Sequence, residues 1–260
     1  MRDIFSSLLV QRRVIGALLM REIITRYGRH NIGFLWLFIE PMLFTLGVTA
    51  LWTATRSTHG STLPIVAFAV TGYSTVLMWR NSATRCSKAI EPNLSLLYHR
   101  NVRVLDIFLS RVTLEVVSAT ASFIALAFFF IATGWMEPPA RLYEMLVAWL
   151  QLIWFSGALG LFVGALSERS EIFERIWHTL TYLIFPLSGA VFMVDWLPSK
   201  AQEYVLMIPM VHAVELVREG YFGSQVIGHG SHGFLATFNL ALTLIGLLMT
   251  ADVSKRVEPE

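Results

Sequence analysis

Six long apolar segments constrain the fold of this chain more than any other feature of its sequence. They cover about 32–52, 63–79, 114–135, 145–166, 176–196 and 233–251. As helices, segments of this length approach or exceed the roughly 30 Å hydrocarbon core of a bilayer. Hydrophobic residues make up 55% of the 260 positions, which is more apolar surface than a soluble domain of this length could bury. We therefore expect an all-α polytopic membrane protein with six transmembrane helices.

The positions of the basic residues predict the orientation of these helices. If the N-terminus is cytoplasmic, sixteen of the twenty Lys and Arg residues lie on the cytoplasmic side. Only Arg56, Arg141, Lys200 and Arg218 then lie outside. Positive charge is enriched in cytoplasmic loops. Both termini of this multi-pass membrane protein are therefore expected in the cytoplasm.

The polar segments between and around the spans predict the domain organisation. Residues 1–31 are expected to form a cytoplasmic amphipathic interfacial helix, and residues 252–260 a cytoplasmic tail. The membrane domain, 32–251, contains a cytoplasmic loop at 80–111 with a short helix beginning near Pro92. Residues 196–230 hold too many charges and helix breakers to span, yet are apolar. They predict two short periplasmic re-entrant helices, separated at Pro209, between the fifth and sixth spans.

Two basic or polar clusters are candidates for function on the cytoplasmic side. The first can hold a phosphate or a sugar carboxylate at a substrate entrance, or can simply anchor the topology on anionic lipid. It contains Arg21, Arg26, Arg29 and His30. The second, in the loop, can dock a cytoplasmic partner or lie on the membrane. It contains Glu91, Asn93, Tyr98, His99 and Arg100.

Glu40 and several aromatic residues are candidates for a pathway through the membrane. Glu40 lies about eight residues into the first apolar segment, where a carboxylate costs roughly 2.5–3.5 kcal/mol. It therefore marks either a gate or a packing hydrogen bond beside Pro41. Aromatic rings can stack on the C–H faces of sugars, although most belong to interface belts or helix packing. The candidates are Trp36, Phe38, Trp52, Tyr73, Trp79 and Tyr182.

Motifs for catalysis or metal binding are missing from the sequence. His212 and Glu215 lie one helical turn apart, and His229 and His232 flank a glycine, but neither pair has a third ligand. The sequence contains no GxxxxGK[ST], HExxH or DxD motif. We therefore expect no catalytic residues, no metal and no cofactor in this chain, and no nucleic-acid partner. Energy for any transport must come from another chain.

Several motifs together resemble a known family of membrane proteins. They are the segments Ala17–Ile23, Thr25–Gly28, Gly33–Trp36, Glu40–Pro41 and Ala89–Glu91, the residues Asp106, Arg111 and Glu115, and the run Pro209–Phe222 with His212, Glu215 and Arg218. In these motifs, and in its length and six-span pattern, the chain is similar to the KpsM-like capsular polysaccharide export permeases of the polysaccharide/polyol phosphate exporter family. These proteins are membrane subunits of ABC transporters.

The resemblance implies a type-2 ABC exporter fold and a set of partners. It implies a homodimer with two copies of a separate ATPase subunit, which would bind ATP and Mg. The path for a lipid-linked acidic polysaccharide would run between protomers, beside the first and fifth spans, and the cytoplasmic loop would couple to the ATPase. A periplasmic adaptor of the polysaccharide co-polymerase type and an outer-membrane exporter would complete a Gram-negative secretion line, which implies that this chain lies in a bacterial inner membrane.

Three other functions stay open from the sequence. The chain can be an O-antigen or teichoic-acid export permease, which the motifs separate less sharply from capsule export. It can be an integral membrane enzyme on lipid-linked sugars, with His212 and Glu215 as acid or base. It can also be a non-transporting anchor for a cytoplasmic assembly, although that role leaves Glu40 and the segment 196–230 unexplained.

Overall fold

The described part of the structure, a computed structural model, covers residues 2–27, 31–55, 63–98 and 102–257. Within these ranges the chain is helical and contains no strand, as the expected all-α class requires. The long helices are α1 (Arg2–Tyr27), α2 (Asn31–Thr55), α3 (Ile65–Ser87), α5 (Val104–Ala132), α6 (Leu142–Arg169), α7 (Glu171–Leu187) and α10 (His232–Val257). The short elements are η1 (Glu91–Asn93), α4 (Leu94–Leu97), η2 (Val194–Trp196), α8 (Ser199–Val205), α9 (Pro209–Phe222) and η3 (Gly223–Gln225).

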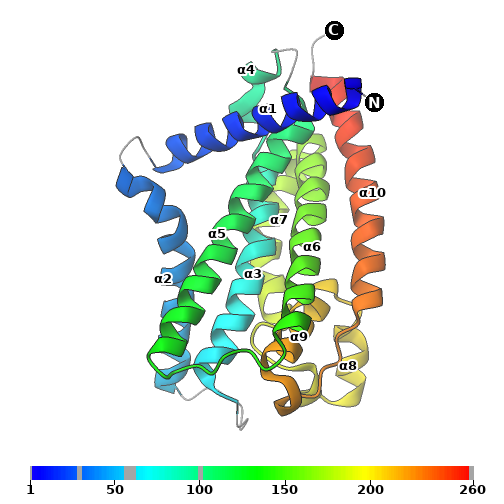
Figure 1. Ribbon diagram of the computed structural model, residues 1–260. Helices are drawn as coiled ribbons and strands as arrows, with labels where there is room; N and C mark the ends of the chain where they lie inside the picture. Colours follow the sequence, from blue (N-terminus) through cyan, green and yellow to red (C-terminus); the bar gives the residue numbers. More distant parts are fainter. Residues whose placement is uncertain (1, 28–30, 56–62, 99–101, 258–260) are drawn as a thin grey trace.

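Six of the long helices form an elongated bundle, and the remaining elements cover its ends. Helix α1 lies across one end, where α4 and both ends of the chain are also found (Figure 1). Helices α8 and α9 lie at the opposite end (Figure 1). We refer to these as the α1 end and the α9 end. Each of the six apolar segments predicted from the sequence falls on one helix of the bundle.

Three helices among the described residues are long and apolar enough to cross a membrane. They are α5, α6 and α10, whereas the apolar stretch of α2 covers only Phe38–Ala54. Helix α3 is more polar, but Ser74, Thr75 and Ser82 are buried inside the bundle. Neighbouring helices, rather than lipid, therefore surround its polar side chains, which explains why its hydropathy is weaker than that of the outer helices.

Helix α3 lies at the centre of the bundle, and close packing with α6 and α5 builds the core around it. Met78 and Trp79 are fully buried there. A Cβ atom on Gly160 of α6 would lie 2.8 Å from Val112 Cγ2, and one on Gly164 would lie 2.7 Å from Phe108 Cε1. The GxxxG spacing therefore allows α6 to approach α5 closely, as small residues do in membrane bundles.

Helix boundaries differ from the predicted ones at two connections. Helix α3 continues to Ser87 and α5 begins at Val104, so the connection between them is 88–103 rather than 80–111. Helix α7 ends at Leu187 instead of reaching 196. Pro186 removes a helical hydrogen-bond donor there, and Gly189 turns the chain with a φ of 83°. Hydropathy alone does not predict these ends, because α3 continues into polar sequence, whereas apolar sequence continues beyond the end of α7.

The two short helices predicted on either side of Pro209 are present as α8 and α9. Pro209 is the first residue of α9, where a missing backbone N–H removes no helical hydrogen bond. Most of α9 is buried against α3 and α6, and α8 is exposed. Near Pro92, η1 followed by α4 forms the short helical element expected in the other connection.

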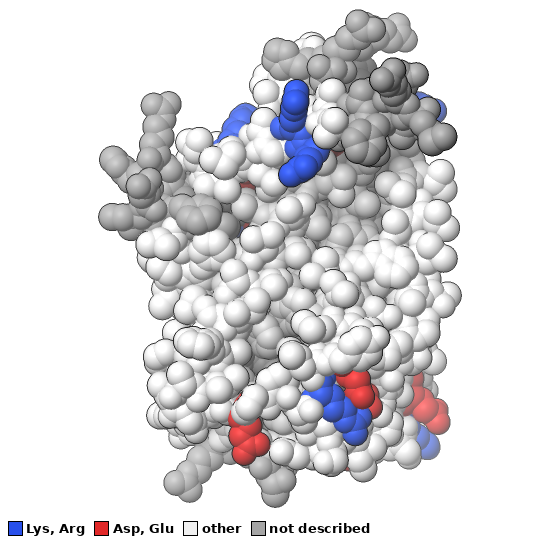
Figure 2. All heavy atoms as spheres, in the orientation of Figure 1, with Lys and Arg blue, Asp and Glu red and all other residues white. Residues whose placement is uncertain are grey.

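Charged side chains lie mainly toward the two ends of the molecule. On the face in Figure 2, arginine and lysine are visible near the α1 end, and both signs of charge are visible near the α9 end. The broad surface between them is uncharged on this face. Charges avoid the hydrocarbon layer because they lose their hydration there, so this distribution is typical of a helical bundle surrounded by lipid.

Candidate functional site

A cavity of about 270 Å³ opens between α2, α3 and α7 and contains both signs of charge. Its polar lining comprises Glu40 from α2, Arg80, Asn81 and Thr84 from α3, and His178, Thr181 and Tyr182 from α7. Pro41, Phe44 and Leu77 complete the wall. Charged side chains within apolar helices require water, a ligand or a charged partner. This cavity is therefore the strongest candidate for a pathway through the bundle.

Arg80 is held in the cavity by an aromatic ring. Its guanidinium carbon lies 4.6 Å from the centroid of the Tyr182 ring, which is the geometry of a cation–π contact. Tyr182 is 67% exposed, so this pair lies at an open surface of the subunit. No ion pair or hydrogen bond joins the side chains of Arg80 or Glu40 to another described residue. Both charges are therefore available to a ligand.

His178 contributes an unused hydrogen-bonding atom to the same lining. Its Nε2 atom is buried and has no hydrogen-bond partner among the described residues. The two threonines are engaged: Thr181 Oγ1 donates to the His178 carbonyl at 2.8 Å, and Thr84 Oγ1 accepts from Trp177 Nε1 at 3.3 Å. A buried imidazole nitrogen that lacks a partner is costly unless water or a ligand reaches it.

Aromatic rings continue from the cavity toward the α9 end. Phe44, which lines the cavity, stacks on Tyr73 at 5.5 Å, and Tyr73 meets Phe185 edge-on at 5.3 Å. Nearer the α9 end, Trp52 lies 6.0 Å from Phe68, and Phe68 stacks on Trp196 at 5.2 Å. Because α2 and α3 run antiparallel, these pairs form two successive levels along the bundle.

The remaining aromatic candidates lie elsewhere. Trp36 is half exposed, and Phe38 lines a separate, apolar pocket between α1, α2 and α5. Trp79, predicted to line a path, is fully buried in the core instead. Adjacent helix residues point about 100° apart, so Arg80 faces the cavity while its neighbour Trp79 faces the protein interior. The structure thus brings together Glu40 and Tyr182, with Tyr73 behind Phe44.

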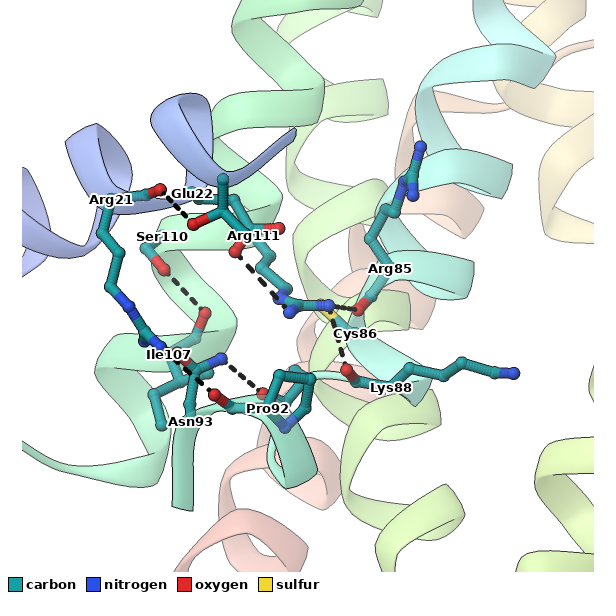
Figure 3. Close-up of polar contacts among 12 residues, drawn as sticks. Arg21, Glu22, Arg85, Cys86, Lys88, Pro92, Asn93, Ile107, Ser110 and Arg111 are labelled. Atoms are coloured by element: carbon teal, nitrogen blue, oxygen red, sulfur yellow. Dashed lines mark hydrogen bonds and ion pairs between the residues drawn. The ribbon is translucent and has the colours of Figure 1, made fainter. Parts of the chain in front are cut away.

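A polar junction at the α1 end joins α1 to the connection that follows α3. The Arg21 guanidinium donates to Asn93 Oδ1 and, at 3.2 Å, to the Pro92 carbonyl (Figure 3). Asn93 is buried and donates through Nδ2 to the Ala89 carbonyl at 2.7 Å. One residue predicted for the entrance is therefore bonded to one predicted for partner docking.

Arg111 forms the second half of this junction. It lies 3.6 Å from the Glu22 carboxylate of α1 and donates to the carbonyls of Arg85 and Lys88, at 2.8 and 3.0 Å (Figure 3). These carbonyls are at the C-terminal end of α3, where backbone acceptors lack helical donors. Gln11 also donates to Asp106 of α5. Helix α1 is thus attached to both α3 and α5.

Other residues predicted at this end are exposed or lie outside the described part. Glu91 and Tyr98 are exposed beside the junction. Arg29, His30, His99 and Arg100 lie outside the described residues, as does the side chain of Arg26. The two predicted clusters are therefore represented in the structure by Arg21, Glu91, Asn93 and Tyr98.

A buried arginine fixes α9 to the bundle. Arg218 Nη1 donates to the carbonyls of Gly189 and Phe192, at 2.6 and 2.8 Å. Its Nη2 donates to those of Ala190 and Phe68, at 2.5 and 3.2 Å, and the guanidinium lies 3.6 Å from the Phe68 ring centroid. Burial lowers the pKa of Arg218 to about 9, and the charge of Glu215 opposes this shift. Arg218 therefore links α9 to α3 and to the turn after α7.

The histidines and Glu215 near α9 have structural partners rather than a catalytic arrangement. Glu215 accepts from the backbone N–H groups of Val194 and His229, at 3.0 and 3.2 Å. Burial raises the pKa of its carboxyl group, and these hydrogen bonds oppose the shift. His212 bonds to the Leu206 carbonyl through Nε2, at 2.7 Å. Among the described residues, no cluster of three or more side chains could hold a metal ion.

Sequence reasoning missed three arginines that organise the structure: Arg80, Arg111 and Arg218. In the sequence these arginines fit the pattern of a topology signal or of a family motif. The available signal was an arginine beside or within an apolar helical stretch, as in the run VHAVELVREGYF. Such a residue needs a buried partner or a cavity. Its partners are backbone carbonyls and rings distant in sequence, which the pattern does not reveal.

Comparisons with known proteins agree over nearly the whole chain. The sequence model of the ABC-2 type transporter family matches residues 13–222. The capsule polysaccharide export inner-membrane protein CtrC of Neisseria meningitidis serogroup B is 53% identical over 256 residues, which cover 98% of this chain and 97% of CtrC. The protein BexB of Haemophilus influenzae, with the same description, is 48% identical over 98% of this chain and 96% of its own length. The polysialic acid transport protein KpsM of Escherichia coli is 28% identical over 92% and 93%.

Proposed function

This chain belongs to the ABC-2 type transporter family, and we propose that it is the permease that exports lipid-linked capsular polysaccharide across the bacterial inner membrane. The observation that carries this function is 53% identity, over 98% of the chain, to a capsule polysaccharide export inner-membrane protein. A mixed-charge cavity beside the exposed rings of Phe44 and Tyr182 gives the bundle a surface suited to a hydrated sugar polymer. The chain is a transport subunit rather than an enzyme.

The proposed topology has six crossings with both termini in the cytoplasm. Its support is the helix on each predicted segment and the position of both chain ends at the α1 end (Figure 1). In this topology 1–31 is interfacial, 32–251 is the membrane domain and 252–260 is a cytoplasmic tail. Helices α8 and α9, within 196–230, enter the membrane from the periplasmic face, where contacts with α3 and α6 cover α9.

The proposed pathway lies between two copies of this chain, along the surfaces of α2 and α7. Three observations support it: the cavity is open between these helices, Tyr182 is exposed, and the ring levels continue from the cavity to the α9 end. Glu40, Tyr182 and Trp52 retain the predicted path role, whereas Tyr73 is buried behind Phe44. Aromatic rings can stack on the C–H faces of sugars at many positions along a polymer. Such contacts suit a polymer that slides past them.

An ATPase partner supplies the energy for the export, as membership of an ABC transporter family implies. We place its docking surface at η1 and α4, where Glu91 and Tyr98 are exposed, with His99 and Arg100 in the same connection. Two ATPase copies would bind ATP and Mg. A periplasmic adaptor and an outer-membrane exporter would continue the path beyond the inner membrane.

Deletion of the gene, with complementation, tests the export function. We expect loss of surface polysaccharide together with accumulation of polymer inside the cell, because synthesis continues while export stops. The measurement is polymer content of surface and cytoplasmic fractions. Normal surface polysaccharide in the deletion strain would contradict the function. Surface loss without internal accumulation would indicate a role in synthesis or anchoring instead.

The rival role as a membrane enzyme has less support in the structure. It requires His212 and Glu215 to act as acid and base, but both accept or donate backbone hydrogen bonds that hold the α9 end together. Groups used in this way are not free to meet a substrate. Purified chain without its ATPase is therefore expected to show no hydrolysis of ATP and no modification of lipid-linked sugars.

A further inference from the structure

The cavity between α2, α3 and α7 contains one arginine whose hydrogen-bonding edge is unused. Arg80 has a ring contact with Tyr182 but no ion pair or side-chain hydrogen bond to a described residue. At the α1 end, by contrast, Arg21 and Arg111 are engaged by Asn93, Glu22 and backbone carbonyls. Of these three arginines, only Arg80 has a side chain with no hydrogen bond or ion pair to a described residue.

The contact with Tyr182 prepares Arg80 for a negatively charged group that accepts two hydrogen bonds. The guanidinium carries five N–H donors in its plane, and a ring over its face leaves that plane open. Carboxylates and phosphates accept two parallel hydrogen bonds from such an edge. A contact at 4.6 Å also restricts the arginine, so less conformational entropy is lost when a ligand binds.

Glu40 places an opposing charge in the same cavity. It comes from α2, across from α3 and α7, and forms no ion pair with a described residue. A carboxylate near a bound anion repels it, and the repulsion is stronger where little water screens the charges. Arg80 thus favours an acidic group in the cavity, and Glu40 limits how long this group remains.

We propose that Arg80, held against Tyr182, binds the carboxylate or phosphate of successive acidic repeats, and that Glu40 weakens this binding so that the polymer can move on. The polymer as ligand rests on the proposed function, whereas the opposite effects of the two charges follow from the cavity itself.

The test measures binding of defined oligosaccharides to the permease–ATPase complex in nanodiscs of zwitterionic lipid. The probes are an oligosialic acid, the same oligomer with its carboxylates reduced to alcohols, and a phosphodiester-linked oligosaccharide. For the acidic probes we expect Arg80→Gln to weaken binding about tenfold or more, as loss of a charged hydrogen-bonding partner does. We expect Glu40→Gln to tighten it severalfold, and both effects to shrink at high salt. Neither change should alter binding of the reduced oligomer.

Matched variants separate a specific site from general charge. Arg175→Gln removes the same charge from α7, but Arg175 is 82% exposed and pairs with Glu171 at 3.6 Å, so acidic probes should bind as they do to the wild-type complex. Arg80→Lys keeps the charge but loses the planar hydrogen-bonding edge. Its affinity for the acidic probes should therefore lie between those of the wild-type complex and Arg80→Gln. Adding anionic lipid to the nanodiscs should leave binding unchanged if the polymer, rather than a headgroup, occupies the cavity.

Several results would overturn the inference. They are shifts of the same sign for Arg80→Gln and Glu40→Gln, equal effects on acidic and reduced probes, loss of binding on adding anionic lipid, and no binding of either acidic probe to the wild-type complex. If Arg80→Gln does not fold, Glu40→Gln and Arg80→Lys still show whether each charge strengthens or weakens the binding of the acidic probes. Export in the complemented deletion strain would meanwhile persist, so the proposed function would stand without this site.

Discussion

At the scale of single residues, Gly72 shows how little space surrounds Arg218. A Cβ atom at Gly72 would lie 2.3 Å from Arg218 Nη2 and 2.7 Å from the Ala190 carbonyl oxygen. The backbone oxygen cannot move as a side chain can, so Gly72→Ala should displace the guanidinium from its carbonyls. We expect a loss of about 1–3 kcal/mol in the free energy of unfolding, as overpacking causes. Thermal unfolding of purified protein measures it.

Gly47→Ala is the matched control for this substitution. A Cβ atom at Gly47, in α2, would meet nothing within 4 Å. Replacing a helical glycine by alanine at an open position usually increases stability slightly, because alanine has less backbone freedom to lose. Equal melting temperatures for the Gly72 and Gly47 variants would mean that the Arg218 anchor is not tightly packed.

His212 should make the α9 end sensitive to acid. Burial lowers the pKa of its imidazole, although the bond to the Leu206 carbonyl opposes the shift. The neutral ring also accepts from the Ser231 N–H at 3.0 Å through Nδ1. The unfolded chain, with an ordinary pKa of about 6.5, binds a proton first. The stabilisation is therefore complete above about pH 6.5 and is lost as pH falls from there toward the folded pKa.

Melting temperatures between pH 7.5 and 5 test this expectation. His212→Gln should be less stable at pH 7.5 and should lose less stability on acidification than the wild-type protein. His229→Gln is the control, because His229 pairs with Asp195 at a more exposed position and should leave the acid dependence in place. An unchanged pH slope in His212→Gln would show that another group causes the acid sensitivity.

At the scale of helices, contacts of Arg21 and Glu22 determine how α1 is attached. Arg21 bonds to Asn93 and Pro92 across 72 and 71 positions of sequence. If these bonds hold α1 against the connection after α3, Arg21→Gln should speed amide hydrogen exchange in the C-terminal half of α1. Mass spectrometry of the exchanged peptides measures this.

Arg13→Gln is the control for that helix. Arg13 is exposed on α1, so its loss removes a similar charge without removing the contact to Asn93. Asn93→Ala should reproduce the effect of Arg21→Gln, and the double variant should add little to either alone. Unchanged exchange in both single variants would show that other contacts, such as Leu18 in the apolar cluster below α1, suffice.

Replacing a glycine of α6 by alanine should lower stability more where neighbouring atoms approach that glycine more closely. At Gly164 a Cβ atom would lie 2.7 Å from the Phe108 ring and 3.1 Å from the Cys86 carbonyl, whereas at Gly157 it would only touch Val112 at 3.8 Å. Gly164→Ala should therefore lower the melting temperature, and Gly157→Ala should not. The reverse order would mean that α6 does not pack against α5 as described.

At the scale of the whole molecule, long apolar segments were sufficient to predict helices that form a bundle, because a segment inside the hydrocarbon core must be apolar and must satisfy its own backbone hydrogen bonds. Their ends were harder to predict: α7 stops at Leu187 because Pro186 and the turn at Gly189 override its apolar composition. The candidate site was only partly predictable. Glu40 and Tyr182, proposed from depth and residue type, both line the cavity, and their role in a path stays a prediction. Trp79 and Arg80 are adjacent in sequence, but Trp79 is buried in the core and Arg80 lines the cavity, and this difference depends on tertiary packing.

The proposed dimer can be tested through exposed apolar residues on two different helices. Leu183 on α7 and Leu248 on α10 are 63% and 73% exposed, and both would face lipid in a monomer. Leu183→Cys should be joined between copies by a short bifunctional maleimide in membranes, and Leu248→Cys should not. Cys86 is buried and can stay in place. Cross-linking at α10 alone would place the partner on the wrong face.

The anchor of α9 has a consequence for how these proteins can diverge. Arg218 contacts its neighbours through main-chain oxygens, at Gly189, Ala190, Phe192 and Phe68. Every amino acid supplies such an oxygen, so substitutions in the turn after α7 leave the anchor intact, except at Gly189, whose left-handed backbone favours glycine. Mutation can therefore change the side chains at the α9 end, which the proposed path would cross, without loosening the framework.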